Sequence, residues 1–264
     1  MGSCLTGHFY KAIKKVKNRK PQYSPLVISE AGGIRYLHFG SEWIQGAMRL
    51  RDPYRIELAY GRQMMAWMLF VGNPGHIVQL GLGTGALTKF SYRHFPQARV
   101  TAVELNPEVI AVCDAMFALP PRDKRLSVLE MDALDFVLDA SNRHAADVMH
   151  VDLYDATAQG PVLDTPEFYG ACNQCLTDDG IMTVNLFGER RSYKKNLLAI
   201  QKSFSFVLSM PKCEEGNIIV VAFKKMPDVD FKKLTETARQ IKQDTGIAAL
   251  KWIKELKLAI GNKA

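Results

Sequence analysis

The sequence predicts an α/β fold in which helices cover both faces of a doubly wound, mostly parallel β-sheet. Two observations lead to this prediction. From residue 76 onwards, short apolar runs typical of buried strands alternate with segments whose apolar residues recur at helical spacing. The first apolar run ends in the glycine-rich stretch GLGTG, residues 81–85, directly before an amphipathic segment. Such alternation is typical of a parallel sheet with connecting helices.

The segments before and after this alternation have other patterns. Short β-like runs separated by Gly32 and Gly33 predict a small antiparallel unit. Residues 54–71 carry apolar side chains at helical spacing, and the turn-forming residues 72–75 end that predicted helix. We therefore expect a basic arm over 1–25, a small β unit over 26–55, a catalytic domain over 56–226 and a helical extension over 227–264.

Within the alternating region, each element is predicted by its own pattern of apolar residues. Strands are expected in HIVQLGLG, RVTAVEL, LSVLEMD, ADVMHVDLYD, GIMTVNLF, FVLSMP and GNIIVVAFKK. Helices are expected in ALTKFSYRHF, PEVIAVCDAMFAL, ALDFVLDAS, PEFYGACNQCL and KKNLLAIQKSF.

The charge of the chain is unevenly distributed. The 264 residues include 34 Lys and Arg and 27 Asp and Glu, which gives a formal net charge of +7. Residues 1–25 and 224–264 together hold 16 of the basic residues but 5 of the acids, so the body of the chain is mildly acidic. This distribution favours solvated basic ends over a nucleic-acid surface, and an acidic body suits cationic small molecules.

Cysteine usage and hydropathy bear on the compartment. The five cysteines are scattered, and the Cys172–Cys175 pair lies in a predicted helix with no second Cys or His pair nearby. We therefore expect core packing for these thiols, no metal site, and a cytoplasmic protein. No apolar run approaches the roughly 18 residues of a membrane span, and no secretory signal is apparent.

The glycine loop is compatible with two classes of ligand. One is a dinucleotide, because GLGTGA satisfies the G-x-G-x-x-G/A pattern, with Glu104 at a suitable distance for a ribose hydroxyl. The other is an adenosyl sulfonium, either S-adenosylmethionine or its decarboxylated form. That class also uses an acid after the third strand, which Asp132 supplies. The glycine loop, Glu104 and Asp132, occurring in this order, together favour the sulfonium. Taken singly, Glu104 could be a solvated strand end and Asp132 a helix N-cap.

A pair of carboxylates follows the fourth predicted strand, in HVDLYD. Asp152 and Asp155 would lie at the same sheet edge as the glycine loop. Such a pair can orient a cationic amine and accept its proton, which an alkyl ammonium of pKa about 10 must lose before it becomes a nucleophile. The structural alternative is a strand-end Asp that caps the following turn.

Taken together, these motifs resemble the polyamine aminopropyltransferases, or spermidine synthases, over roughly residues 26–224. The resemblance implies a Rossmann-like fold of the class I S-adenosylmethionine methyltransferase type. The matching segments are the glycine loop, ELNPEVI (104–110), Asp132-Ala133, VDLYD (151–155), GPVLDTPEFY (160–169), PKCEEGNIIVVAF (211–223), WIQG (43–46) and LAYGRQM (58–64).

The resemblance implies an in-line displacement. An amine such as putrescine would attack the aminopropyl carbon of decarboxylated S-adenosylmethionine and give spermidine and methylthioadenosine. The catalytic set would be Asp152, Asp155 and Tyr60. The cofactor-binding set would be Gln45, Gly81, Gly83, Thr84, Gly85, Glu104, Asp132 and Ala133. Residues 156–166 would cover the site, and a homo-dimer or tetramer would be usual for the family.

The sequence also departs from the family pattern. Thr84 stands where typical members have an aspartate that holds the aminopropyl ammonium. Gly61 follows Tyr60 where a histidine or glutamine is usual, and Cys213-Glu214 replaces an expected tyrosine. Two alternatives therefore stay open: an S-adenosylmethionine-dependent methyltransferase on the same scaffold, and a non-catalytic relative that binds a nucleoside or RNA. The apolar faces within 231–256 could serve an oligomer or pack on their own domain.

Overall fold

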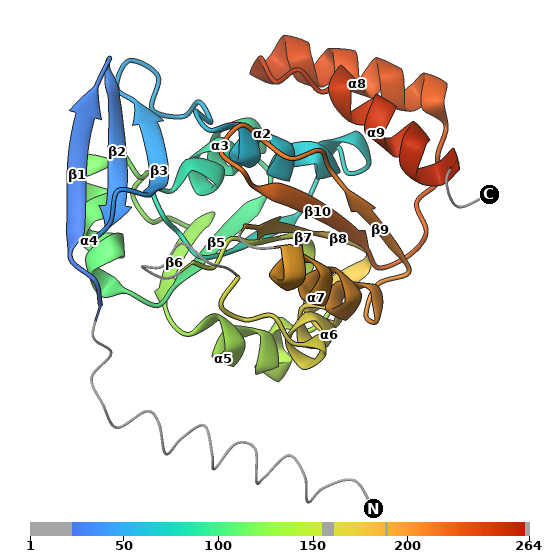
Figure 1. Cartoon of the computed structure of the whole chain (residues 1–264), viewed down its shortest axis with the longest axis horizontal. Helices are drawn as coiled ribbons and strands as arrows, with labels where there is room; N and C mark the ends of the chain where they lie inside the picture. Colours follow the sequence, from blue (N-terminus) through green and yellow to red (C-terminus); the bar gives the residue numbers. More distant parts are fainter. Residues whose placement is uncertain (1–22, 155–160, 188–189, 262–264) are drawn as a thin grey trace, which may run out of the picture.

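The protein has a small sheet at one end and a large sheet at its centre. The computed structural model describes residues 23–154, 161–187 and 190–261, and Figure 1 shows their arrangement. Most of the expected arm, residues 1–22, lies outside this description. The small sheet consists of three antiparallel strands, β1 (Leu26–Ala31), β2 (Ile34–Phe39) and β3 (Ile44–Arg49).

The large sheet has seven strands in the order β6-β5-β4-β7-β8-β10-β9. The first five of these are parallel to one another, while β10 runs antiparallel to both β8 and β9. The mostly parallel, doubly wound sheet predicted from the sequence is thus confirmed. The strands are β4 (His76–Leu80), β5 (Arg99–Glu104), β6 (Leu126–Glu130), β7 (Ala146–Val151), β8 (Leu176–Leu186), β9 (Phe206–Ser209) and β10 (Ile218–Phe223).

Helices cover both faces of the large sheet because successive strand residues face opposite sides. In β4, Ile77 packs in the core beneath one layer of helices and Val78 in the core beneath the other. One layer contains α5 (Ala133–Leu138), α6 (Pro166–Cys175) and α7 (Arg190–Gln201). The opposite layer contains α2 (Ala59–Met64), α3 (Ala86–His94), α4 (Pro107–Met116) and the two C-terminal helices.

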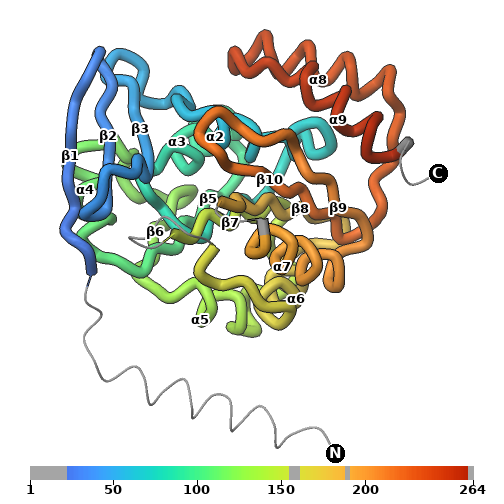
Figure 2. The backbone as a smooth tube through the Cα atoms, in the orientation of Figure 1, coloured from blue at the N-terminus to red at the C-terminus, as the bar shows by residue number. Residues whose placement is uncertain are grey.

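The C-terminal helices pack on their own domain. Helix α9 (Leu250–Gly261) contacts β9, and α8 (Phe231–Thr245) packs against α9 and the segment Met65–Leu69; Figure 2 shows the two helices side by side. Their apolar residues, among them Leu234, Trp252 and Leu256, belong to the same buried cluster as Ile77. Gly246, at φ +76°, ends α8 in the left-handed conformation that favours glycine. These apolar faces are therefore already covered within the chain.

The continuous helix predicted over 54–71 was wrong. The chain forms the short helix α2 and then a 3₁₀ segment, Met65–Leu69. Before α2, the carbonyls of Ile56 and Glu57 accept hydrogen bonds from the Arg62 side chain. All five residues of the 3₁₀ segment are buried, so it has no solvated face of the kind that an amphipathic helix presents.

Candidate active site

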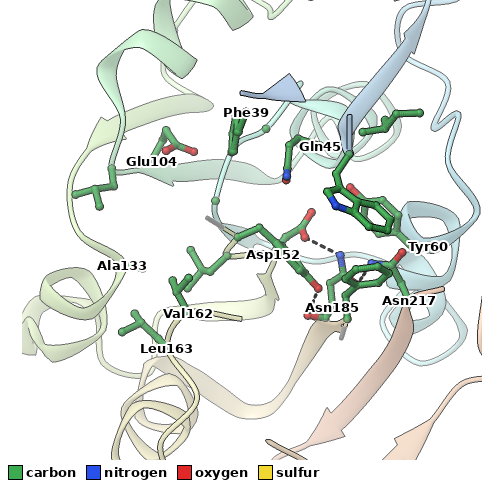
Figure 3. Close-up of a pocket in the computed structure, with 18 of the residues that line it drawn as sticks. Phe39, Gln45, Tyr60, Glu104, Ala133, Asp152, Val162, Leu163, Asn185 and Asn217 are labelled. Atoms are coloured by element: carbon green, nitrogen blue, oxygen red, sulfur yellow. Dashed lines mark hydrogen bonds between the residues drawn. The ribbon is translucent and has the colours of Figure 1, made fainter. Parts of the chain in front are cut away.

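A cavity of about 450 Å³ opens at the carboxyl ends of the parallel strands. The chain segments that follow β4, β5, β6, β7 and β8 line its floor, and Phe39, Trp43 and Gln45 of the small sheet line the opposite side. Figure 3 shows Gln45 and Tyr60 near Asp152, with Glu104 and Ala133 further along the cavity. This is the edge at which doubly wound sheets bind ligands.

The glycine loop, which follows β4, lies in close contact with the backbone that follows β7. Gly81 has φ +88°, and a Cβ added there would lie 2.1 Å from the backbone carbonyl oxygen of Asp152. Gly83 has φ +54° and lines the cavity. The buried side chain of Gln79 donates a hydrogen bond of 2.7 Å to the carbonyl of Gly81 and accepts one from the Thr88 hydroxyl. Gly81 therefore sets the position of Asp152 as well as the shape of the loop.

Two acids line one end of the cavity. The carboxylate of Glu104 accepts backbone hydrogen bonds of 2.9 Å from Leu82 and from Asn106, one to each oxygen. Burial raises the pKa of Glu104, and these N–H donors oppose the rise. Asp132 accepts a 2.8 Å hydrogen bond from the amide of Leu134 as the N-cap of α5. Both carboxylates thus have fixed orientations and retain lone pairs for ligand hydroxyl or amino groups.

Asp152 lies at the other end of the cavity among buried polar groups. Its Oδ1 accepts a 2.8 Å hydrogen bond from Asn185, whose own Oδ1 accepts a 2.9 Å bond from Asn217 (Figure 3). Burial raises the pKa of Asp152 to about 6, although the hydrogen bonds from Asn185 and Tyr60 act in the opposite direction. Burial, followed by the charge of Asp152, raises the pKa of Tyr60 well above its usual value, so Tyr60 stays a neutral donor. A carboxyl of pKa about 6 is suited to accepting protons near neutral pH.

The cavity lining is strongly acidic. Five carboxylate side chains line it, whereas no Lys, Arg or His is found among the described lining residues. The five are Glu42, Glu104, Asp132, Asp152 and Glu215. Because uncompensated carboxylates repel one another and attract cations, this lining favours a positively charged ligand.

Two polar atoms of the lining are buried without a hydrogen-bond partner in the described parts of the chain. They are Nε2 of Gln45 and Oε2 of Glu215. Leaving a buried polar group unpaired costs roughly 1–3 kcal/mol. A donor and an anionic acceptor left free in the same cavity fit a ligand that carries both hydroxyl or ring acceptors and a cationic group.

The structure brings together most, but not all, of the site residues expected from the sequence. Tyr60, Asp152, Gln45, Gly81, Gly83, Glu104, Asp132 and Ala133 all line the cavity. Thr84 does not: it is 3% exposed and lines a small adjoining recess shared with Tyr60 and Asp152. Gly85 begins α3 and packs near Leu119 and Cys113 instead. Asp155 and residues 156–160 of the expected cover lie outside the described residues.

The sequence patterns did not single out several of the residues that line the cavity. Asn185 is the last residue but one of the buried strand β8 and is 2% exposed, and Asn217 immediately precedes β10. Trp43 and Phe187 form an edge-to-face aromatic pair, with ring centroids 5.7 Å apart, at the wall of the cavity. The available signal was a polar residue at the end of an otherwise apolar strand, as in the segment TVNLF.

The described parts of the chain contain neither a cluster of metal-binding side chains nor a membrane-spanning helix. Over residues 23–154, 161–187 and 190–261, no group of three or more His, Cys, Asp or Glu side chains is placed to hold a metal ion. The four described cysteines are free and buried. None of the helices in these ranges is long and apolar enough to cross a membrane.

Comparison with known proteins identifies the family. The model of the spermine/spermidine synthase domain matches residues 57–233. The chain is 32% identical over 261 residues to the polyamine aminopropyltransferase of Neisseria meningitidis serogroup B, covering 98% of this chain and 97% of the relative. It is 33% identical over 251 residues to that of Chromobacterium violaceum, covering 94% of each. The chain belongs to the spermine/spermidine synthase family.

Solved structures of other proteins share the fold. A probable spermidine synthase from Corynebacterium glutamicum superposes with a TM-score of 0.69 at 19% identity, over 90% of this chain and 91% of that one. Human methyltransferase-like protein 13 in complex with SAH gives 0.62 at 23% identity, over 71% of this chain and 92% of that one. In sequence, the eEF1A lysine and N-terminal methyltransferase of Bos taurus is 27% identical over 187 residues, which cover 66% of this chain but 26% of that protein.

Proposed function

We propose that this synthase-family chain transfers the aminopropyl group of decarboxylated S-adenosylmethionine to putrescine or a similar amine. The products are spermidine, or its counterpart, and methylthioadenosine. The observation that carries the proposal is the acidic cavity, in which Asp152 has a pKa of about 6 and no described lining residue is basic. The carboxylates suit an ammonium and a sulfonium, and the cavity of about 450 Å³ is within the usual range of small-molecule sites.

The residues divide between two parts of the proposed substrate. Glu104 would accept hydrogen bonds from ribose hydroxyls, and Asp132 from the amino group of adenine. The free Nε2 of Gln45 would donate to the nucleoside, and Gly83 would leave room for close approach of its chain. Asp152 and Tyr60 would hold the attacking amine. Thr84, Gly85 and Asp155 stay predictions as site residues.

The chemical step is a nucleophilic displacement. A bond forms between the amine nitrogen and the aminopropyl carbon next to sulfur, the bond from that carbon to sulfur breaks, and its electron pair leaves with the neutral thioether. The nitrogen loses a proton to Asp152. Proton transfer from an ammonium of pKa about 10 to a carboxyl of pKa about 6 is uphill by about 5 kcal/mol, and raising the Asp152 pKa from 3.8 lowers this cost by about 3 kcal/mol.

The methyltransferase alternative has one observation in its favour, since Thr84 offers no charge where the family's loop has an acid. The charge of the cavity argues against it. Intact S-adenosylmethionine carries a carboxylate, and the described lining has no cationic side chain to pair with it. Calorimetry with the two cofactors separates the alternatives: preference for the intact form would assign the chain to methyl transfer.

The variant Asp152→Asn tests the proposed mechanism. We expect turnover of putrescine to fall by about 10²- to 10⁴-fold, because the base is lost. The affinity for methylthioadenosine, measured by calorimetry, should change little. Asp147→Asn is a matched control, because Asp147 lies on the same strand, β7, but does not line the cavity. An active Asp152→Asn enzyme would remove the base from the mechanism.

A further inference from the structure

Two amide side chains lie end to end behind the carboxylate of Asp152, and the mechanism above gives the farther one, Asn217, no role. Nδ2 of Asn185 donates a 2.8 Å hydrogen bond to Oδ1 of Asp152. Nδ2 of Asn217 in turn donates a 2.9 Å bond to Oδ1 of Asn185 (Figure 3). Among the described residues, no hydrogen bond joins Asn217 to Asp152 itself. Any hydrogen-bonded influence of Asn217 on the carboxylate therefore passes through Asn185.

The order of donors and acceptors along this row follows from the charge of Asp152. An ionised carboxylate can only accept hydrogen bonds, so Asn185 must present its Nδ2 to Asp152. Its Oδ1 then faces the other way and needs a donor, which Nδ2 of Asn217 supplies. A protonated Asp152 could itself donate, which would allow the Asn185 amide to turn over. The row therefore favours the ionised carboxyl as long as Asn217 offers its donor.

The backbones of both asparagines are held in place. Asn185 is 2% exposed and Asn217 is 8% exposed. The Tyr154 hydroxyl donates a 2.9 Å hydrogen bond to the backbone carbonyl of Asn185, and the Cys213 amide donates a 2.8 Å bond to that of Asn217. Burial, followed by the charge of Asp152, raises the pKa of Tyr154 well above its usual value, so Tyr154 stays a neutral donor. With the backbones fixed, each side-chain amide can change direction only by exchanging its partners.

The other charged and titratable groups near Asp152 come from neighbouring elements. Tyr60 of α2 donates a hydrogen bond that lowers the pKa of Asp152, whereas the charge of Glu104, the last residue of β5, raises it. Glu215 lines the same cavity and raises the pKa of Tyr60. Burial is the largest cause of the raised Asp152 pKa, and the bond from Asn185 is the largest effect that opposes it. The direction of the Asn185 amide therefore has more weight than any other contact that favours the ionised form.

We propose that Asn217 is a positioning residue, which fixes the Asn185 amide in the direction that keeps Asp152 ionised. The inference rests on the proposed function, in which Asp152 accepts the proton of the attacking amine. Asn217 acts through Asn185 and needs no contact with the reacting atoms. Because the loop between β9 and β10 carries Asn217, the placement of this loop is part of what makes Asp152 a base.

The test begins with Asn217→Leu, which keeps the size of the side chain and removes the donor. The acid limb, which is the fall of kcat/KM at low pH, should move upward by about 0.5–1 pH unit, as expected for one lost neutral hydrogen bond. Relative to the wild type, kcat/KM should fall by about two- to fivefold near pH 6 and be unchanged at about pH 9. Asn173→Leu is the matched control, because Asn173 donates a 2.8 Å bond to the Ser203 carbonyl and does not line the cavity. Its acid limb should stay in place.

A double-mutant comparison separates action through Asn185 from a direct effect. In the Asn185→Leu background, Asn217→Leu should cause no further shift, because the amide that it positions is gone. An equal shift in both backgrounds, or an acid limb that does not move in Asn217→Leu, would overturn the assignment. Asn217→Ala removes the donor without adding bulk and gives the same comparison if the leucine variant does not fold.

An NMR titration distinguishes failure of this inference from failure of the proposed function. The chemical shift of the Asp152 carboxyl carbon, assigned with Asp152→Asn, reports the pKa of that group without any turnover. The pKa should rise in Asn217→Leu even if no transfer is detected in any variant, and an unchanged pKa would overturn the role of Asn217. Absence of transfer in the wild type would instead overturn the proposed function.

Discussion

The hydrogen bond from Asn185 to Asp152 should set the pH at which the enzyme becomes active. Asn185 donates a 2.8 Å bond to Oδ1 of Asp152, and this bond lowers the pKa of the carboxyl against the effect of burial. Replacing Asn185 with Leu keeps a side chain of similar size in a position that is 2% exposed, so water stays excluded. The donor is lost, and the neutral form of Asp152 becomes more favourable.

The magnitude follows from the charge of the acceptor. A hydrogen bond to a charged group contributes about 1.5–3 kcal/mol, and one pKa unit corresponds to 1.36 kcal/mol. Loss of the bond should therefore raise the pKa of Asp152 by about 1–2 units from its value of about 6. Because Asp152 must be ionised to act as a base, activity is lost as pH falls through this pKa. The acid limb of the profile should move from about pH 6 to about pH 7–8.

The assay is the pH dependence of kcat/KM for the amine, which reports groups of the free enzyme and free substrate. Asn196→Leu is the matched control, because Asn196 is 1% exposed and bonded to Tyr169 but does not line the cavity. Both variants should lose stability through a broken polar network, and only Asn185→Leu should shift the acid limb. An acid limb that stays near pH 6 in Asn185→Leu would refute the claim that this bond tunes a catalytic base.

Two further predictions concern the glycine loop. Gly81→Ala should both lower the melting temperature and abolish activity, because φ is +88° and the new Cβ would lie 2.1 Å from the Asp152 carbonyl. Thermal unfolding measures the loss of stability, and a stable, active variant would contradict the prediction. Thr84→Asp should increase the affinity for decarboxylated S-adenosylmethionine while destabilising the free protein, since the carboxylate would be buried near Asp152. Calorimetry and unfolding measure the two effects, and a fall in affinity would show that the ammonium lies elsewhere.

The sequence was sufficient to predict the parts of the site that belong to single segments. Glu104 and Asp132 follow strands whose apolar runs are clear, and parallel strands bring their carboxyl ends to one edge. Asp152 follows the same rule, and the hairpin turn at Gly32 and Gly33 is observed with positive φ at both glycines. In these cases local pattern and global topology agree, so a residue's position along the chain predicts its position in the fold.

Features that depend on contacts between distant segments could not be predicted in this way. Asn217 reaches Asn185 only because β10 returns antiparallel to β8, in a register that pairs Ile218 with Leu186. The orientation of Glu215, which leaves one of its oxygens free, depends on a hydrogen bond from the amide of Ala59, 156 residues away in the sequence. No periodicity in one segment contains such information.

The packing of Thr84 gives a physical meaning to its departure from the family's loop. A Cβ added to Gly46 would lie 2.6 Å from Cγ2 and 2.7 Å from Oγ1 of Thr84, so the threonine side chain occupies the space above a glycine of the small sheet. This contact pairs the glycine loop with β3, which also carries Gln45 into the cavity. An acid at 84 would share its recess with Asp152 and would raise the pKa of that carboxyl further. The threonine therefore preserves the packing of the loop on β3 and spares Asp152 a second nearby charge, while Glu215 retains a free anionic oxygen at the cavity wall.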